Sequence, residues 1–183
     1  MKASDRIRER LTRPITLIGL MGSGKSLVGR QLATTLDLPF TDSDQVVEAI
    51  AGISIADIFD LAGEAKFREM EQRAISETME SGICVLSVGG GAVCHLDTAA
   101  LLKERSILVW LKASPETLLS RIGSTASRPL LHGNDPLAAL KHLAEARADD
   151  YAIADVVITT DGMSGTTATN AVLRALDSHL AVT

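Results

Sequence analysis

The sequence predicts a three-layer α/β/α domain in which helices cover both faces of a parallel sheet. Short apolar runs alternate along the chain with segments of helical periodicity, and this alternation is typical of right-handed strand–helix–strand crossovers. The runs are continuously apolar, as strands buried on both faces require. The length of 183 residues suits one domain, 1–183.

Five strands and eight helices follow from these patterns. The strands are expected at 15–20, 39–41, 83–88, 107–111 and 156–159. The helices are expected at 25–36, 44–51, 55–62, 64–81, 97–104, 115–122, 136–151 and 164–180. The first 13 residues alternate acids and bases and have no apolar signal core, so we expect a short solvated lead-in that can be helical.

The first strand runs into residues 19–26, which read GLMGSGKS and match the phosphate-loop pattern G-x-x-x-x-G-K-[ST]. Glycines let the backbone wrap a phosphate with its N–H groups inward, Lys25 reaches the β- and γ-phosphates, and the Ser26 hydroxyl can bind Mg²⁺. A helical pattern follows directly, as this loop requires. The residues expected to hold the nucleotide are Gly22, Ser23, Gly24, Lys25, Ser26 and Leu27. The chain is therefore expected to bind a nucleoside triphosphate.

Two acids, Asp42 and Asp44, follow the second strand. Ligands of open parallel sheets bind beyond the carboxyl ends of the strands, so both should face the phosphate loop. Asp42 can hold a water on Mg²⁺ beside Ser26, and Asp44 can accept a hydrogen bond from an acceptor hydroxyl. The alternative is that Asp44 only caps the following helix.

A second loop, the triglycine loop Gly89, Gly90 and Gly91, follows the third strand. Three glycines allow close approach of a ligand and offer bare N–H donors, although a plain turn is the alternative. On the long helical segment, Arg68 and Glu71 lie three residues apart on one face. An arginine oriented by a carboxylate suits a substrate carboxylate, whereas a solvated ion pair would contribute little.

One polar segment interrupts the pattern. Residues 123–135, with Arg128 at their centre, connect two helices and are expected to form a mobile lid over the site, since phosphoryl transfer must exclude water. A tolerated surface insertion is the alternative.

Composition narrows the partners and the compartment. A net charge of −5 and 3% aromatic residues argue against binding to nucleic acid or to an anionic membrane. No apolar stretch approaches the ~20 residues of a membrane span. Cys84 and Cys94 have no metal-binding spacing, Cys84 is expected in the core, and a nucleotide-binding enzyme implies the reducing cytoplasm. No coiled-coil pattern or sticky patch is evident, so a monomer is expected.

Together these motifs resemble the shikimate kinases. The phosphate loop, Asp42-Ser-Asp44, Gly63-Glu64 with Phe67-Arg68 and Glu71, the triglycine loop and Arg128-Pro-Leu-Leu131 occur in that family's order and spacing, over about residues 15–155. The resemblance implies a five-stranded fold of the P-loop nucleoside monophosphate kinase type with a mobile lid. It also implies transfer of the γ-phosphoryl group of ATP to the 3-hydroxyl of shikimate, a step of chorismate and aromatic amino acid biosynthesis.

The resemblance assigns roles residue by residue. It implies that Asp44 orients the acceptor hydroxyl and takes its proton, that Lys25 and Arg128 stabilise the transferring group, and that Arg121 stacks beside adenine. Shikimate would be held by a further set, Asp44, Arg68, Gly89, Gly90, Gly91 and Arg147. Ser26 and Asp42 would serve Mg²⁺.

The chain departs from the family pattern after Arg147, where Asp149 and Asp150 precede Tyr151. Two acids at this place can draw Arg147 away from a substrate. This departure keeps open a kinase for another hydroxy acid such as gluconate. A catalytically silent nucleotide-binding module is the other alternative, although such a module has no need for the whole catalytic set.

Overall fold

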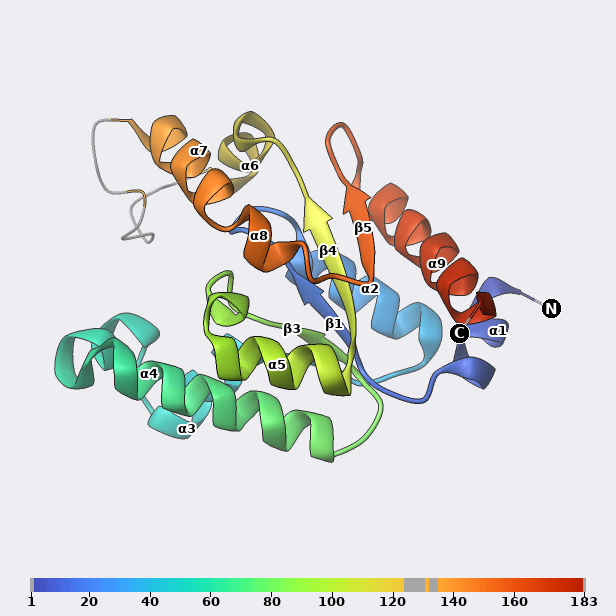
Figure 1. The fold of residues 1–183 in the computed structure, drawn as a ribbon, viewed down its shortest axis with the longest axis horizontal. Coiled ribbons are helices and arrows are strands. Elements are labelled where there is room, and N and C mark those ends of the chain that lie inside the picture. Colours follow the sequence, from blue (N-terminus) through green and yellow to red (C-terminus); the bar gives the residue numbers. More distant parts are fainter. Residues whose placement is uncertain (1, 124–130, 132–134, 183) are drawn as a thin grey trace.

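In the computed structural model, residues 2–123, 131 and 135–182 are described. They form a five-stranded sheet in the order β2-β3-β1-β4-β5, with every pair of neighbours parallel (Figure 1). The strands are β1 (Ile15–Ile18), β2 (Phe40–Asp42), β3 (Val85–Ser87), β4 (Ile107–Lys112) and β5 (Val156–Thr159). The predicted fold class is confirmed, and each expected strand is present with ends within two residues of those expected.

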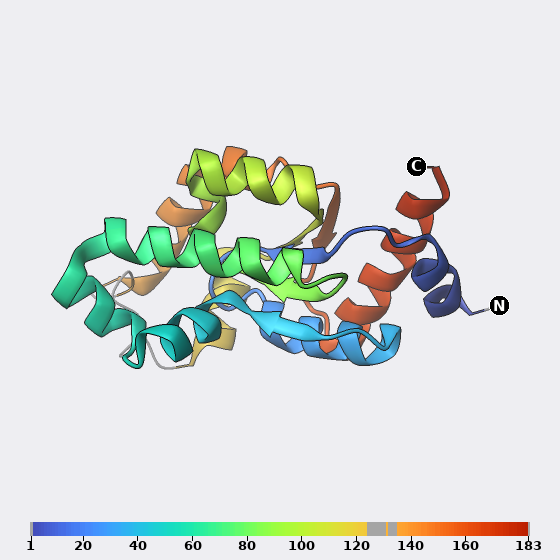
Figure 2. The same ribbon diagram turned by 90° about the horizontal axis from the view of Figure 1, so that it is seen from below.

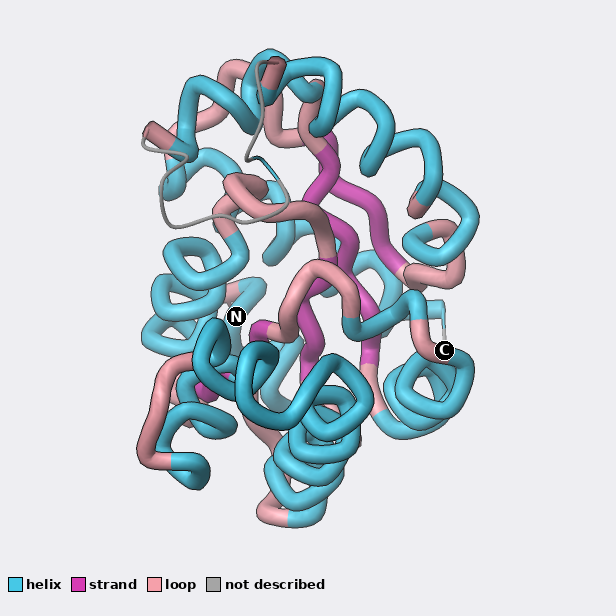
Figure 3. The backbone as a smooth tube through the Cα atoms, turned by 90° about the vertical axis from the view of Figure 1, so that its left-hand side faces the viewer, coloured by secondary structure: helices cyan, strands magenta, loops and turns pink. Residues whose placement is uncertain are grey.

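Helices cover both faces of the sheet, so the strands lie inside the molecule (Figures 2 and 3). One core lies between the sheet and α1 (Ala3–Arg10), α2 (Lys25–Leu36) and α9 (Gly165–Val182). The other lies under a second group of helices: α4 (Ile55–Glu80), α5 (Leu96–Arg105), α6 (Pro115–Ile122), α7 (Pro136–Ala146) and α8 (Ala148–Tyr151). The short α3 (Ser43–Ala51) packs on α4 through a small third core.

Burial differs between the central and the edge strands. Every residue of β1 and β3 is buried, as their apolar runs predict. The edge strand β5 alternates instead: Val156 and Ile158 are buried, whereas Val157 and Thr159 are exposed. The expectation that strands are buried on both faces therefore fails at β5, whose second face is left exposed by the described part of the chain.

The N-terminal segment corrects another expectation. It forms the helix α1, in which Ile7 is 0% exposed, and Leu11 just after it is also buried in the core beside α9. Arg6 pairs with Asp177 of α9. The segment is not a solvated lead-in, because two apolar residues four positions apart on a short charged helix are enough to attach it to the domain.

One expected helix division is confirmed and another division was missed. The helices expected at 55–62 and 64–81 both lie within α4, and Gly63, with φ +80°, separates them at the predicted place. Only glycine adopts this conformation at low cost. The helix expected at 136–151 is two, because Arg147, with φ −105° and ψ 4°, ends α7 before α8 begins.

No helix in the described part of the chain is long and apolar enough to cross a membrane.

Candidate active site

The strand order brings three sequence motifs to one edge of the sheet. Asp42 of β2 lies in register with Ser87 of β3, and Ser87 with Leu17 of β1. The phosphate loop, the two acids and the triglycine loop follow these neighbouring strands, so they meet beyond the carboxyl ends. They enclose a hollow of about 400 Å³. Its lining is Met21, Gly22, Gly24, Lys25, Ser26, Leu27, Asp42, Asp44, Gln45, Ser87, Val88, Gly89 and Gly90.

The phosphate loop has the backbone that its glycines predict. Gly22 and Gly24 have φ values of +77° and +95°, a region that other residues rarely adopt, and Gly24 leads into α2. Lys25 Nζ donates to the carbonyls of Gly19 and Leu20 at 2.7 and 3.1 Å, so the ammonium lies over the loop. The helix N-terminus and this cation together favour an anion at the loop.

Ser26 and Asp42 lie side by side. Ser26 Oγ donates to Asp42 Oδ2 at 3.0 Å, while Asp42 Oδ1 accepts from the Asp44 backbone N–H at 3.1 Å. Asp42 therefore caps α3, and it is not Asp44 that does so. Among the described residues no cluster of three or more His, Cys, Asp or Glu is suited to a metal ion. A hydroxyl beside one carboxylate nevertheless fits Mg²⁺, which takes few protein oxygens when phosphates supply the others.

Asp44 and Glu71 each present a buried oxygen that accepts no hydrogen bond from a described group, Asp44 Oδ1 and Glu71 Oε1. Both oxygens lie against Gly89: a Cβ added there would be 3.0 Å from the first and 2.9 Å from the second. Burial, and next the charge of Asp42, raises the pKa of Asp44, whereas Lys25 and Arg68 act in the opposite direction. A buried acceptor oxygen without a donor is costly, so these two are ready to receive ligand hydroxyls.

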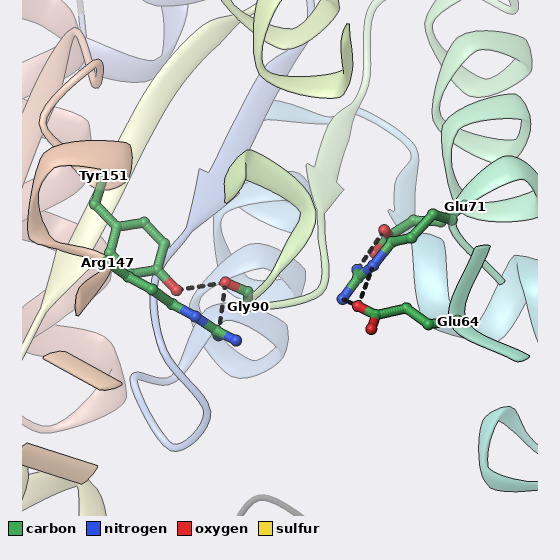
Figure 4. A network of polar contacts seen from close by, with 6 residues as sticks. Glu64, Glu71, Gly90, Arg147 and Tyr151 are labelled. Atoms are coloured by element: carbon green, nitrogen blue, oxygen red, sulfur yellow. Dashed lines mark hydrogen bonds and ion pairs between the residues drawn. The ribbon is translucent and has the colours of Figure 1, made fainter. Parts of the chain in front are cut away.

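Arg68 is fixed against the triglycine loop. Its Nη1 donates to Glu71 Oε2 at 2.7 Å, and Glu64 lies 3.4 Å away on the other side (Figure 4). The Glu71 side chain is 1% exposed, so the pair is not the solvated ion pair of the alternative interpretation. A Cβ on Gly91 would be only 2.7 Å from Arg68 Nη2, which shows how closely the guanidinium lies on the loop.

Arg147 approaches the triglycine loop from the opposite side (Figure 4). Its Nη1 donates to the Gly90 carbonyl at 3.2 Å, and Tyr151 Oη donates to the same oxygen at 2.6 Å. Within the described part of the chain, Arg147 forms no ion pair with Asp149 or Asp150. Burial, and next the neighbouring Asp150, raises the pKa of Cys94 to about 11.

A second hollow, of about 370 Å³, adjoins the phosphate loop on the β4–β5 side. Its lining is Gly22, Ser23, Gly24, Leu27, Val28, Arg121, Thr160, Met163, Ser164, Gly165 and Ala168. Arg121 of α6 is held there by Thr160, to whose hydroxyl and carbonyl it donates at 2.9 and 2.6 Å. The planar guanidinium thus forms part of the wall of a space that continues from the phosphates, as a base-binding site requires.

The structure brings all but one of the predicted site residues to these two adjoining hollows or to the triglycine loop. Arg128 is the exception, because it lies outside the described residues, as does most of the predicted lid, 123–135. Sequence reasoning missed Tyr151 as a contact of Gly90. The available signal was the spacing of Tyr151, four residues after Arg147 in a segment predicted to be helical, since residues four apart lie on one face of a helix. Both cysteines are free, and Cys84 is buried as predicted.

Comparison with known proteins gives consistent matches. A family model described as shikimate kinase matches residues 21–177. The chain is 45% identical over 173 residues to the shikimate kinase of Caulobacter vibrioides, a span of 94% of this chain and 86% of that protein. The shikimate kinase from Acinetobacter baumannii, solved in complex with shikimate, has a TM-score of 0.88 at 33% identity and covers 96% of this chain and 97% of its own. A gluconokinase from Sinorhizobium meliloti 1021, with a TM-score of 0.56 at 18% identity over 93% of both chains, shares the fold alone.

Proposed function

The chain belongs to the shikimate kinase family, and from this premise we propose that it transfers the γ-phosphoryl group of ATP to the 3-hydroxyl of shikimate, giving shikimate 3-phosphate and ADP. The observation that carries this proposal is the position of Asp44. Its Oδ1 is buried, accepts no hydrogen bond from a described group, and lines the same hollow as Lys25. An acceptor hydroxyl bonded to it is presented to a phosphate held by the loop.

Shikimate is a small acid with several hydroxyl groups, and the groups around the triglycine loop complement both features. Asp44 Oδ1 and Glu71 Oε1 receive hydroxyls, because both are buried acceptors to which no described group donates. Arg68, held by Glu71, and Arg147, anchored on Gly90, bind the carboxylate from opposite sides of the loop. Arginine suits this task, since its planar fork bonds both carboxylate oxygens.

Phosphoryl transfer then depends on position and charge. The acceptor oxygen attacks the γ-phosphorus, the bond from that phosphorus to the β–γ bridging oxygen breaks, and the hydroxyl proton passes to Asp44. The raised pKa of Asp44 makes it a better base than an ordinary aspartate. Lys25 moves from the loop carbonyls to the phosphates, where its charge stabilises the transferring group. From its place in the sequence we assign Arg128 to the same task.

Ser26 and Asp42 are the residues that would hold Mg²⁺. Ser26 Oγ would be the direct ligand, and Asp42, which accepts from that hydroxyl and from the Asp44 N–H, would orient it. Mg²⁺ bound with ATP would supply positive charge that neutralises the phosphates. Arg121 and the walls of the second hollow take the adenosine part.

The decisive experiment measures ADP release from Mg·ATP with shikimate, with gluconate or with neither. We expect release that depends on shikimate and a drop in kcat of about 10²- to 10⁴-fold for Asp44→Asn, the usual contribution of a general base. ATP binding by calorimetry should persist in this variant. The matched control is Asp57→Asn, an exposed acid in the first turn of α4, which should keep wild-type kcat.

Two results would reject the proposal. Release with gluconate but not with shikimate would make the chain a kinase for another acid. ATP binding without release in the presence of either acid would favour a silent module. No feature of the site now supports gluconate, since Asp149 and Asp150 leave Arg147 on the triglycine loop.

We further propose that the protein works as a monomer in the cytoplasm. All groups assigned above come from one chain, and both cysteines are free, as a reducing compartment allows. Light scattering coupled to size exclusion checks the first statement: a mass of twice 19.4 kDa would contradict it.

A further inference from the structure

The central carbonyl of the triglycine loop accepts two hydrogen bonds at once. Tyr151 Oη donates to Gly90 O at 2.6 Å, and Arg147 Nη1 donates to it at 3.2 Å (Figure 4). A carbonyl oxygen has two lone pairs, so these donors saturate it. Tyr151 itself is 1% exposed, and its ring stacks on Trp110 with centroids 5.4 Å apart. The phenol is therefore a rigid donor, whereas Arg147 is a flexible one.

Fixing this carbonyl also orients the rest of the loop. The peptide unit is planar and trans, so the Gly91 N–H points away from the Gly90 carbonyl and hence away from α8. No described group accepts a hydrogen bond from the backbone N–H of Gly90 or Gly91. Held from behind by Tyr151, the loop turns an unused donor toward the side on which Arg68 lies.

Glycines cannot fix such a loop themselves. They have no side chains and the most mobile backbone of any residue, yet a Cβ built on Gly89 or Gly91 would be 3.0 Å or less from Asp44, Glu71 or Arg68. A small shift of the loop would change the distances among all three groups. The constraint must come from outside the loop, and Tyr151 and Arg147 are the side chains that supply it at Gly90.

We infer that Tyr151 is a positioning residue for the acceptor site: its hydroxyl holds the Gly90 carbonyl and so sets the triglycine loop against Asp44, Glu71 and Arg68. This inference rests on the proposed function for its substrate but not for its geometry. Burial raises the pKa of Tyr151 to about 12, against the opposing effect of Arg147, so the phenol keeps its proton and remains a donor at any physiological pH.

The test is Tyr151→Phe, which keeps the ring and its stacking on Trp110 and removes only the hydroxyl. We expect KM for shikimate to rise about 3- to 10-fold, the range that corresponds to one hydrogen bond, while KM for ATP stays within about 2-fold. The matched control is Ser106→Ala. Ser106 Oγ is also a buried hydroxyl bonded to a carbonyl, Leu102 O at 2.8 Å, but it precedes β4 at the opposite end of the sheet.

A second measurement is independent of the substrate. Backbone N–H groups of Ala92 and Cys94 donate to Gly89 O and Gly91 O at 3.0 and 3.1 Å, so their hydrogen exchange reports the order of the loop. We expect Tyr151→Phe to speed this exchange in the free protein and Ser106→Ala to leave it unchanged.

The two measurements separate the possible failures. Unchanged exchange, or a KM that rises equally for ATP and shikimate, would overturn the role of Tyr151. A wild-type protein without activity toward shikimate, but with exchange that speeds up in Tyr151→Phe, would reject the proposed substrate and leave the positioning of the loop supported.

Discussion

Burial is the largest cause that raises the pKa of Asp44 and of Glu71. The charge of Asp44 raises the pKa of Glu71 further, while Arg68 lowers both. The cost of burying each carboxylate is not fully offset, because one oxygen of each accepts no hydrogen bond from a described group. Two uncompensated carboxylates cost folding stability, and a bound substrate with hydroxyl donors would recover part of that cost.

Because burial disfavours the charged form of Asp44, we expect Asp44→Asn to stabilise the protein. Because the folded-state pKa is raised, the folded protein keeps its proton at pH values where the unfolded chain has lost it, so stability falls as pH rises through the folded-state pKa. At pH 8 the Asn side chain replaces an ionised Asp44, whose negative charge is destabilised by burial. We expect Tm to rise by about 2–4 °C, the shift that ~1 kcal/mol gives in a domain of this size.

Calorimetry at several pH values checks this prediction. The gain should shrink as pH falls through the raised folded-state pKa, where the wild-type group becomes neutral, and should be gone near about 4, the ordinary pKa of an aspartate. The exposed Asp57, replaced by Asn, should show no gain at any pH. A lower Tm for Asp44→Asn at pH 8 would mean that Lys25 and Arg68 outweigh the effect of burial.

The residues of the site were largely predictable, because each carries its chemistry in its type and spacing. The phosphate loop follows from a fixed pattern, and the Arg68–Glu71 pair from helical spacing. The second feature of Glu71 was not predictable. Its Oε1 lies beside Gly89 and accepts no hydrogen bond from a described group, and this depends on how β3 lies against α4. Asp42 could not be identified as the cap of α3 either, because the start of a helix shifts by a residue without changing the sequence pattern.

At the scale of elements, the triglycine loop is shaped by contact rather than by backbone strain. Gly89, Gly90 and Gly91 all lack the positive φ that requires glycine. Their environments differ, however. A Cβ on Gly91 would clash with Arg68 at 2.7 Å, whereas a Cβ on Gly90 would find its nearest atom, Gly19 O, at 3.4 Å. Position 91 therefore requires glycine more strictly than position 90 does.

This contrast predicts different outcomes for neighbouring substitutions. Gly91→Ala should displace the Arg68 guanidinium and raise KM for shikimate by about 10- to 100-fold, the value of a hydrogen bond to a charged group. KM for ATP should not change, since Arg68 lies outside the nucleotide hollow. Gly90→Ala is the comparison, and steady-state kinetics should show a smaller rise in KM for shikimate than Gly91→Ala gives, because a Cβ on Gly90 has no contact shorter than 3.4 Å. Equal effects of both substitutions would indicate a general need for a flexible loop.

The elements themselves followed from periodicity, and the errors have local causes. Gly63 was correctly predicted as a break, because glycine is the residue that allows positive φ. The break at Arg147 was missed, since no glycine or proline marks it; the bonds of Arg147 and Tyr151 to Gly90 fix it from outside the helix. The burial of Ile7 was missed because its partner, α9, is more than 150 residues away in the sequence.

At the scale of the whole molecule, the strand order separates two tasks. From β1, which carries the phosphate loop, β3 and β2 lead to most groups for the acceptor, and Arg147 reaches the triglycine loop from the segment between β4 and β5. On the other side, β4 and β5 lead to Arg121 and Thr160 at the second hollow. The sequence predicts which segments are strands but not this order, because the order depends on where each crossover helix packs. The division nevertheless explains how one sheet holds two substrates on either side of a single loop.

The division also predicts which parts of the molecule affect stability without affecting the site. Helix α1 packs under α9, at the end of the sheet remote from both hollows (Figure 1), and Ile7 fills the core there. Ile7→Ala should lower the free energy of unfolding by about 2–5 kcal/mol, the usual cost of such a cavity. KM for both substrates should stay unchanged below the melting range, because the sheet between α1 and the loops is rigidly packed.

Denaturant titration and steady-state kinetics on one preparation test this prediction against a matched variant. Ile50 is 59% exposed on α3, so Ile50→Ala removes the same atoms and should cost less than about 1 kcal/mol. Equal losses for the two variants would mean that α1 is only loosely attached, as a solvated lead-in would be. A large rise in either KM for Ile7→Ala would mean that the packing of α1 against α9 affects the loops of the site. The helices that support the sheet would then contribute to substrate binding as well as to stability.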